Sequence, residues 1–158
     1  MVRKLAVIGM WAVGALCAAA QEVRPYNGDY YGFYTVGQCQ HGVQITGGGG
    51  GAEALVWKGL TVGAEFGYQS FTGSSGFGML TPQFGYHFVD RKKPGRWDPF
   101  VTMGAGFAFS HGTASAINFG GGVTYWAKPR FGIRVEYRAH VLAYEEGINA
   151  VRFGVAFR

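Results

Sequence analysis

The chain has 158 residues, a formal net charge of +5, 28 glycines and an aromatic content of 16%. This length suffices for one domain of ordinary size. After the first twenty residues, no apolar run reaches the roughly eighteen residues that a transmembrane helix needs. The positive charge does not indicate nucleic-acid binding, because the basic residues do not line one strand face.

The N-terminus has the three parts of a secretory signal peptide. Arg3 and Lys4 form a basic start, residues 5–16 are apolar, and residues 18–20 are alanines that offer a cleavage site. This pattern is too short and wrongly flanked for a membrane-spanning helix. We therefore expect the chain to be exported and the segment 1–20 to be removed.

Cleavage would leave a polar N-terminal lead, residues 21–29, followed by one folded domain, residues 30–158. Cys39 is the only cysteine of that mature chain, so no intramolecular disulfide is possible. The protein would enter an oxidising compartment without using disulfides for stability.

Eight segments of the domain are predicted to be strands, because residues of opposite character alternate with a period of two. They cover residues 30–38, 43–57, 60–71, 76–89, 99–110, 114–126, 130–141 and 148–157. The first alternates poorly. The second contains five consecutive glycines, which we interpret as part of a strand that lines a crowded interior. Pro82, in the fourth, cannot donate to a sheet ladder and indicates a bulge or a local weakness.

The clearest alternation lies in residues 130–141. Its odd positions are apolar from Phe131 to Val141, whereas its even positions include Arg134, Glu136 and Arg138. Two such different faces must separate two different media. Most connections are short, which predicts sequential antiparallel hairpins. Eight amphipathic strands without a helix to cover an edge close most easily into an up-and-down barrel, which makes the fold all-β.

Side-chain size indicates which face points inward. The interior of an eight-stranded barrel is only wide enough for its own side chains. Here one face carries three or four bulky residues on nearly every strand, whereas the other is a mixture of glycine, alanine, threonine and a few charges. The small-residue face fits the narrow interior, so the bulky face must point outward, toward lipid. The predicted fold is therefore a transmembrane β-barrel.

The signal peptide, the eight alternating segments and the closing segment VRFGVAFR resemble the small outer-membrane β-barrels of Gram-negative bacteria, of the OmpA-transmembrane, OmpX and opacity-protein type. The resemblance implies a monomer in the cell outer membrane, surrounded by outer-membrane lipids, with both chain ends in the periplasm. It also implies that the barrel-assembly machinery recognises alternating apolar residues that end in an aromatic residue. The matching positions here are Val151, Phe153, Val155 and Phe157. Arg158 departs from the pattern, because it makes the aromatic residue penultimate.

This orientation gathers basic residues in the connections that face the periplasm. They are Lys58, Arg91, Lys92, Lys93, Arg96 and Lys128. The opposite connections contain no lysine or arginine. A cationic rim would suit the anionic headgroups of the inner leaflet. An ordinary solvated turn is the alternative interpretation.

The most informative chemistry is a set of charged residues on the predicted lumenal face. It consists of Glu53, Glu65, Arg134, Glu136, Arg138 and Arg152. Unpaired charges in such an interior would be costly, so we expect ion pairs that cross the lumen. These pairs would plug a lumen that is too small to conduct. A narrow path for ions or small solutes is the alternative.

Catalysis and cofactor binding have little support in the sequence. No nucleophile motif accompanies the paired carboxylates, and no helix follows the glycine runs as a nucleotide-binding loop requires. His41, His111 and His140 lie on separate segments and are interpreted as incidental, so no metal or cofactor is expected. We expect a non-enzymatic protein, structural or surface-interacting. Its short connections argue against an adhesin. A soluble periplasmic ligand-binding barrel is a further alternative.

Overall fold

A computed structural model of the chain describes residues 27–40, 42–73, 75–89, 95–110, 112–142 and 147–158. The predicted signal peptide lies outside these residues. Eight strands follow one another along the chain. They are β1 (Gly28–Cys39), β2 (Gln44–Trp57), β3 (Leu60–Phe71), β4 (Phe77–His87), β5 (Trp97–Phe109), β6 (Thr113–Lys128), β7 (Phe131–Leu142) and β8 (Gly147–Phe157).

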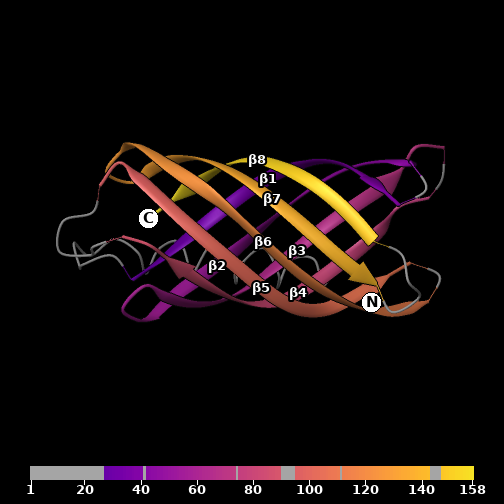
Figure 1. Cartoon of the computed structure of the whole chain (residues 1–158), viewed down its shortest axis with the longest axis horizontal. Helices are drawn as coiled ribbons and strands as arrows, with labels where there is room; N and C mark the ends of the chain where they lie inside the picture. The colour runs from indigo at the N-terminus through magenta and orange to yellow at the C-terminus, as the bar shows by residue number, and fades with distance from the viewer. Residues whose placement is uncertain (1–26, 41, 74, 90–94, 111, 143–146) are drawn as a thin grey trace, which may run out of the picture.

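The strands form a closed up-and-down barrel (Figure 1). Each strand pairs antiparallel with the next, and β1 pairs with β8 from Tyr30↔Phe157 to Cys39↔Ile148. The predicted fold class is thereby confirmed. We call the end where β1 begins and β8 finishes the terminal end, and the opposite end the far end. No helix among the described residues is long and apolar enough to cross a membrane.

Four strands begin earlier than the sequence predicted, β6 and β8 by one residue and β1 and β5 by two. β1 begins at Gly28 rather than Tyr30, and β5 begins at Trp97 rather than Pro99. Asp29 and Asp98, which we expected in the N-terminal lead and in a polar connection, are therefore strand residues with buried side chains. Both corrections add a carboxylate to the lumen at the terminal end.

Pro82 interrupts one ladder without shifting it. The pairs between β4 and β5 pass directly from Leu80↔Phe107 to Gln83↔Gly104, so the register is the same on both sides of Pro82. The ladder therefore lacks pairs at Thr81 and Pro82, and the bulge that was one of the two expectations is not present. Register shifts occur instead next to the turns at the terminal end, between Leu55 and Trp57 and between Trp126 and Lys128.

The outer surface of the barrel is apolar and largely aromatic. More than half of the surface of Phe66, Phe84, Met103, Phe119 and Phe153 is exposed, although each lies within a strand. The charged side chains of the same strands are buried, except for Lys128 at the last position of β6. This is the reverse of the arrangement in a water-soluble barrel, and it requires an apolar solvent around the molecule. The predicted inside-out arrangement of the two faces is thus present.

The glycine run of β2 makes room for aromatic rings of β1. Tyr31 is buried, and Phe33 packs beside it with the ring centroids 6.3 Å apart. A Cβ atom on Gly49 would lie 2.7 Å from the Phe33 ring, and one on Gly51 would lie 2.6 Å from the Tyr31 hydroxyl. The poor alternation of β1 has the same origin, because this strand carries aromatic residues on both faces.

An apolar cluster fills the far end of the lumen. It contains the buried residues Cys39, Ile45, Phe77, Met79, Ala108, Ala116 and Ile148, with Phe71 and Leu142 packed against them. The lumen is therefore apolar at the far end and charged in its middle and terminal parts.

Candidate functional site in the barrel lumen

All six predicted lumenal charges are buried in the interior of the barrel. They come from β2, β3, β7 and β8, and none exceeds 4% exposure. The alternation of β7 explains half of the set, because Arg134, Glu136 and Arg138 are successive inward positions of that strand.

Glu65 on β3 is the centre of the pairs that cross the lumen. Its Oε1 lies 2.7 Å from Nη1 of Arg152 on β8, and its Oε2 lies 3.5 Å from Nη2 of Arg138 on β7. Nε of Arg138 also donates to Oε1 of Glu136, at 2.5 Å. The expected cross-lumen ion pairs are therefore present, and they join β3 to β7 and β8.

Arg134 forms a second group nearer the terminal end. Its Nη1 donates to Oε1 of Glu53 at 3.0 Å, and its Nε lies 3.4 Å from Oε2 of Glu136. The guanidinium also lies over two aromatic rings, 4.2 Å from the centroid of Tyr31 and 3.8 Å from that of Phe100. Contacts of this kind stabilise a desolvated cation more strongly than an exposed one.

Neutral polar side chains complete both groups. Arg138 donates from Nη1 to Asn118 at 2.6 Å and to Gln83 at 3.2 Å. Thr61 donates to Oε2 of Glu53 at 2.9 Å, and the Tyr31 hydroxyl donates to Oε2 of Glu65 at 3.2 Å. These bonds matter because buried ion pairs offset their desolvation only when additional hydrogen bonds satisfy the charged groups.

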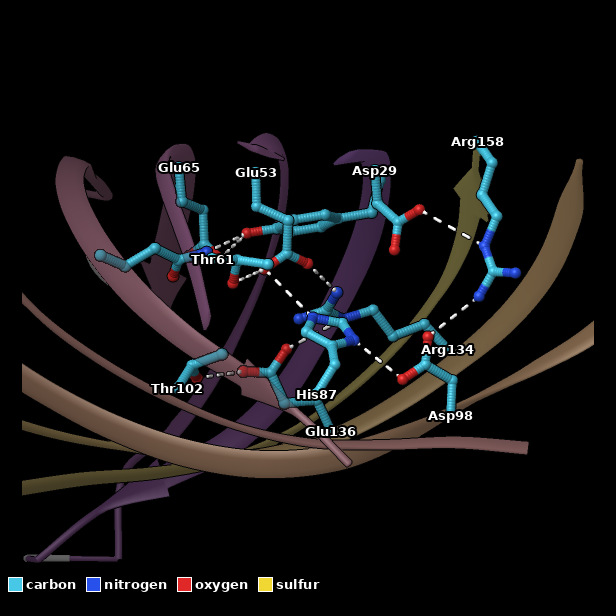
Figure 2. A network of polar contacts seen from close by, with 12 residues as sticks. Asp29, Glu53, Thr61, Glu65, His87, Asp98, Thr102, Arg134, Glu136 and Arg158 are labelled. Atoms are coloured by element: carbon cyan, nitrogen blue, oxygen red, sulfur yellow. Dashed lines mark hydrogen bonds and ion pairs between the residues drawn. The ribbon is translucent and has the colours of Figure 1, made fainter. Parts of the chain in front are cut away.

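Figure 2 shows a further cluster of charged side chains at the terminal end of the lumen. The sequence analysis did not predict it. Nδ1 of His87 lies 2.8 Å from Oδ1 of Asp98, while its Nε2 lies 3.4 Å from Oε2 of Glu53. Arg158 reaches into the same region: its Nη2 donates to Oδ2 of Asp98 at 3.0 Å, and its Nε lies 3.8 Å from Oδ1 of Asp29.

Trp126 forms one wall of this terminal cluster. Its Nε1 donates to Oδ2 of Asp98 at 3.3 Å, and the guanidinium of Arg158 lies 3.6 Å from the centroid of its ring. The sequence signal that could have found the cluster is continued alternation. The inward positions of the predicted fifth and eighth strands are even-numbered. Asp98, just before the fifth strand, and Arg158, just after the eighth, are also even-numbered. The same alternation would therefore place both side chains in the lumen.

The other predicted site residues lie away from the lumenal charges, with one exception. Val151, Phe153, Val155 and Phe157 are exposed on the outer face of β8, and Lys58, Arg96 and Lys128 are exposed at the terminal end. Arg91, Lys92, Lys93, His41 and His111 lie outside the described residues. The exception is His140, which is buried in the lumen with its Nε2 3.3 Å from Nη2 of Arg152. It therefore lies beside the lumenal charges, although we expected no role for it from the sequence.

The array of Thr61, Glu53, His87 and Asp98 bears on enzymatic activity. A histidine between two carboxylates can act as a base when a hydroxyl nucleophile donates to it. Here Thr61 donates to Glu53 instead, and the side chains of Glu53, His87 and Asp98 are at most 1% exposed. The arrangement is suited to pairing buried charged side chains with one another in a packed interior.

The fold and the lumen together define a class: an eight-stranded β-barrel with an apolar exterior and a charged, filled interior. This is the architecture of the small outer-membrane β-barrels. No protein-family model matches the sequence, and no curated protein matches it.

Solved structures share the fold at low sequence identity. Neisserial surface protein A (NspA) aligns over 85% of this chain and 97% of its own, with 10% identity and a TM-score of 0.61. The N-terminal β-barrel domain of Pseudomonas aeruginosa OprF aligns over 82% and 96%, with 15% identity and a TM-score of 0.61. The outer-membrane enzyme PagL aligns over 81% and 99%, with 16% identity and a TM-score of 0.56. These similarities establish the fold.

Proposed function

We propose that this chain is a non-enzymatic protein of the outer membrane, whose barrel is a closed structural element with a lumen plugged by ion pairs. The observation that carries the proposal is the contact between Arg152 and Glu65, at 2.7 Å across the interior. Both side chains are almost completely buried, so the pair occupies the space through which a solute would have to pass.

The remaining lumenal contents support a closed barrel. The apolar cluster around Ile45 and Ile148 fills the far end. Arg134, stacked on Tyr31 and Phe100, fills the part nearer the terminal end. An eight-stranded barrel has little interior volume to spare beyond such side chains.

The exterior supports an outer-membrane location with the terminal end in the periplasm. The apolar outer surface matches a bilayer, and the exposed Lys58, Arg96 and Lys128 lie at the terminal end, where they would meet anionic headgroups. The connections at the far end are short, which favours a structural role over adhesion through long loops.

PagL shows that an enzyme can have this fold, so the fold alone does not exclude catalysis. What supports the non-enzymatic proposal is the donation of the Thr61 hydroxyl to Glu53, which leaves the buried His87 without a hydroxyl nucleophile among the contacts described.

Conductance across a planar lipid bilayer tests the plug. We expect the purified wild-type barrel to show a conductance near zero. The double variant Glu65→Gln with Arg152→Gln removes the ion pair, and because glutamine is shorter than arginine it also leaves space at the pair, so it should show measurable openings. A matched control is Tyr137→Phe, which removes an exposed hydroxyl that donates to Asn149 on the outer face.

Steady conductance of the wild-type barrel, unchanged in the double variant, would contradict the plug and favour a narrow pore. Fractionation of expressing cells tests the location independently. The protein should sediment with outer membranes, whereas recovery in the soluble periplasmic extract would contradict a membrane barrel.

A further inference from the structure

We propose that Asp29, His87 and Asp98 form a zinc-binding site at the terminal end of the lumen, and that Arg158 competes with the metal for it. One donor atom from each residue can be chosen so that all three lie within 4.8 Å of one another. They come from β1, β4 and β5, so the barrel itself brings them together (Figure 2).

The donor set fits zinc by chemistry and nearly by geometry. One imidazole and two carboxylates are common zinc ligands, and three protein ligands leave a fourth position for water. Zinc binds such ligands at about 2.1 Å, so two ligands of a tetrahedral ion lie about 3.4 Å apart. The donor atoms, which lie up to 4.8 Å apart, would therefore need to approach one another by up to about 1.4 Å. Calcium and magnesium are a poorer match, because they prefer six or more oxygen ligands or octahedral oxygen sets.

The surroundings of the three residues orient them as metal ligands are usually oriented. A histidine that binds a metal through one ring nitrogen generally donates the other N–H to a carboxylate. Nε2 of His87 faces Oε2 of Glu53 at 3.4 Å, so a metal would bind at Nδ1 and would replace the present contact of Nδ1 with Oδ1 of Asp98 at 2.8 Å. Nε1 of Trp126 donates to Oδ2 of Asp98, so this ligand is also held from outside the cluster.

The charge balance of the lumen supports a cation at this end. Among the described residues, five carboxylates face the interior against four guanidinium groups, counting Arg158. Glu65, Glu136, Arg138 and Arg152 balance one another in the middle of the barrel, and Arg134 pairs with Glu53. When His87 is neutral, as a metal ligand must be, the remaining excess of negative charge is at Asp29 and Asp98, next to Arg158. One divalent cation would neutralise both aspartates without Arg158.

Arg158 is placed to exchange with such an ion. Its side chain is 12% exposed, and it contacts both aspartates from the terminal end. Its guanidinium and a zinc ion would use the same carboxylate oxygens, so each must weaken the binding of the other. The site should therefore load from the periplasmic side, with Arg158 moving outward.

Calorimetric titration of Zn²⁺ into the untagged, folded barrel in detergent tests the proposal, with Co²⁺ absorption as a second reading of the ligand set. We expect one ion per barrel. His87→Gln should weaken binding by more than about a hundredfold, since it removes a ligand, and loss of a residue that only supports a ligand already costs about 10–100-fold. Arg158→Gln should tighten binding by about tenfold, because it removes a positive charge beside the metal. Heat-modifiable migration confirms that each variant is folded before titration.

Two controls separate this site from other histidines. His140→Gln alters the other described buried histidine, and the pair His41→Gln with His111→Gln removes the two histidines outside the described residues; both variants should bind Zn²⁺ as the wild type does. Absence of binding to the wild-type barrel overturns the site, even if Arg158→Gln binds. Equal binding by a folded His87→Gln barrel also overturns it. Unchanged affinity in Arg158→Gln overturns the competition.

Discussion

Glu65 and Arg152 show how a single pair can hold two distant strands together. Their contact at 2.7 Å joins β3 to β8, and both side chains are buried. Removal of one partner of a buried pair is expected to be more costly than replacement of both, because the remaining charge is left without its counter-ion.

The prediction at this pair is a double-mutant cycle. Glu65→Gln should lower the free energy of unfolding by about 3–5 kcal/mol, since it strands Arg152. Arg152→Gln in the same barrel should recover part of that loss. The measurement is urea unfolding in lipid vesicles. Additive effects of the two substitutions would show that the pair contributes no coupling.

Glycines of β2 and β1 offer a second prediction at the residue scale. Gly51→Ala would place a methyl group against the Tyr31 hydroxyl and should destabilise the barrel by about 1–3 kcal/mol through overpacking. Gly32→Ala is the matched control, because its Cβ would meet only a backbone oxygen at 3.8 Å. Equal unfolding midpoints in urea for these two variants would contradict the packing of β1 against β2.

At the scale of elements, β8 closes the barrel and carries the proposed assembly signal. Its outward residues Val151, Phe153, Val155 and Phe157 are exposed along the strand. The structure also changes our expectation for Arg158. From the sequence we expected its deletion to leave assembly intact or improved. Its contacts with Asp98 and Trp126 instead indicate that its loss weakens the closed terminal end.

The corresponding prediction concerns Phe157. Phe157→Ser should lower the fraction of heat-modifiable, folded protein in outer membranes, because the assembly machinery would lose its aromatic anchor. Phe109→Ser is the matched control, since Phe109 is also an exposed aromatic residue at a strand end but lies on β5. Equal losses in both variants would mean that aromatic burial in lipid, and not recognition of β8, explains the effect.

For single strands, the sequence correctly predicted which side chains point inward where one face of the strand is uniformly apolar. The alternation of residues 130–141 correctly placed Arg134, Glu136 and Arg138 on one face of β7. It was uninformative for β1, where Tyr31 points inward although most aromatic residues point outward. The contact between Asp98 and His87 could not be predicted, because it depends on the exact start of β5 and on the register of β5 against β4.

For the whole molecule, the outward position of the apolar face and the inward position of the charged face determine in which solvent the protein is stable. Ile133 and Val135 are 50% and 39% exposed, whereas Arg134 between them is 2% exposed. An exterior of this composition would aggregate in water, and in a bilayer it contacts hydrocarbon. Ile133→Arg should therefore cost about 2–4 kcal/mol of stability in lipid vesicles if the position lies near the bilayer midplane. Ile133→Leu should have little effect on the same urea midpoint.

Collision of a spin label with lipid-soluble and water-soluble quenchers tests the central claim most directly. Labels are attached singly at Ile133→Cys and Val135→Cys, in a barrel whose buried Cys39 is replaced by serine. Our account predicts that both labels are strongly relaxed by oxygen dissolved in the bilayer and weakly by an aqueous nickel chelate. If both labels are instead shielded from the lipid-soluble quencher, the apolar face points inward, and the barrel is not the membrane protein described above.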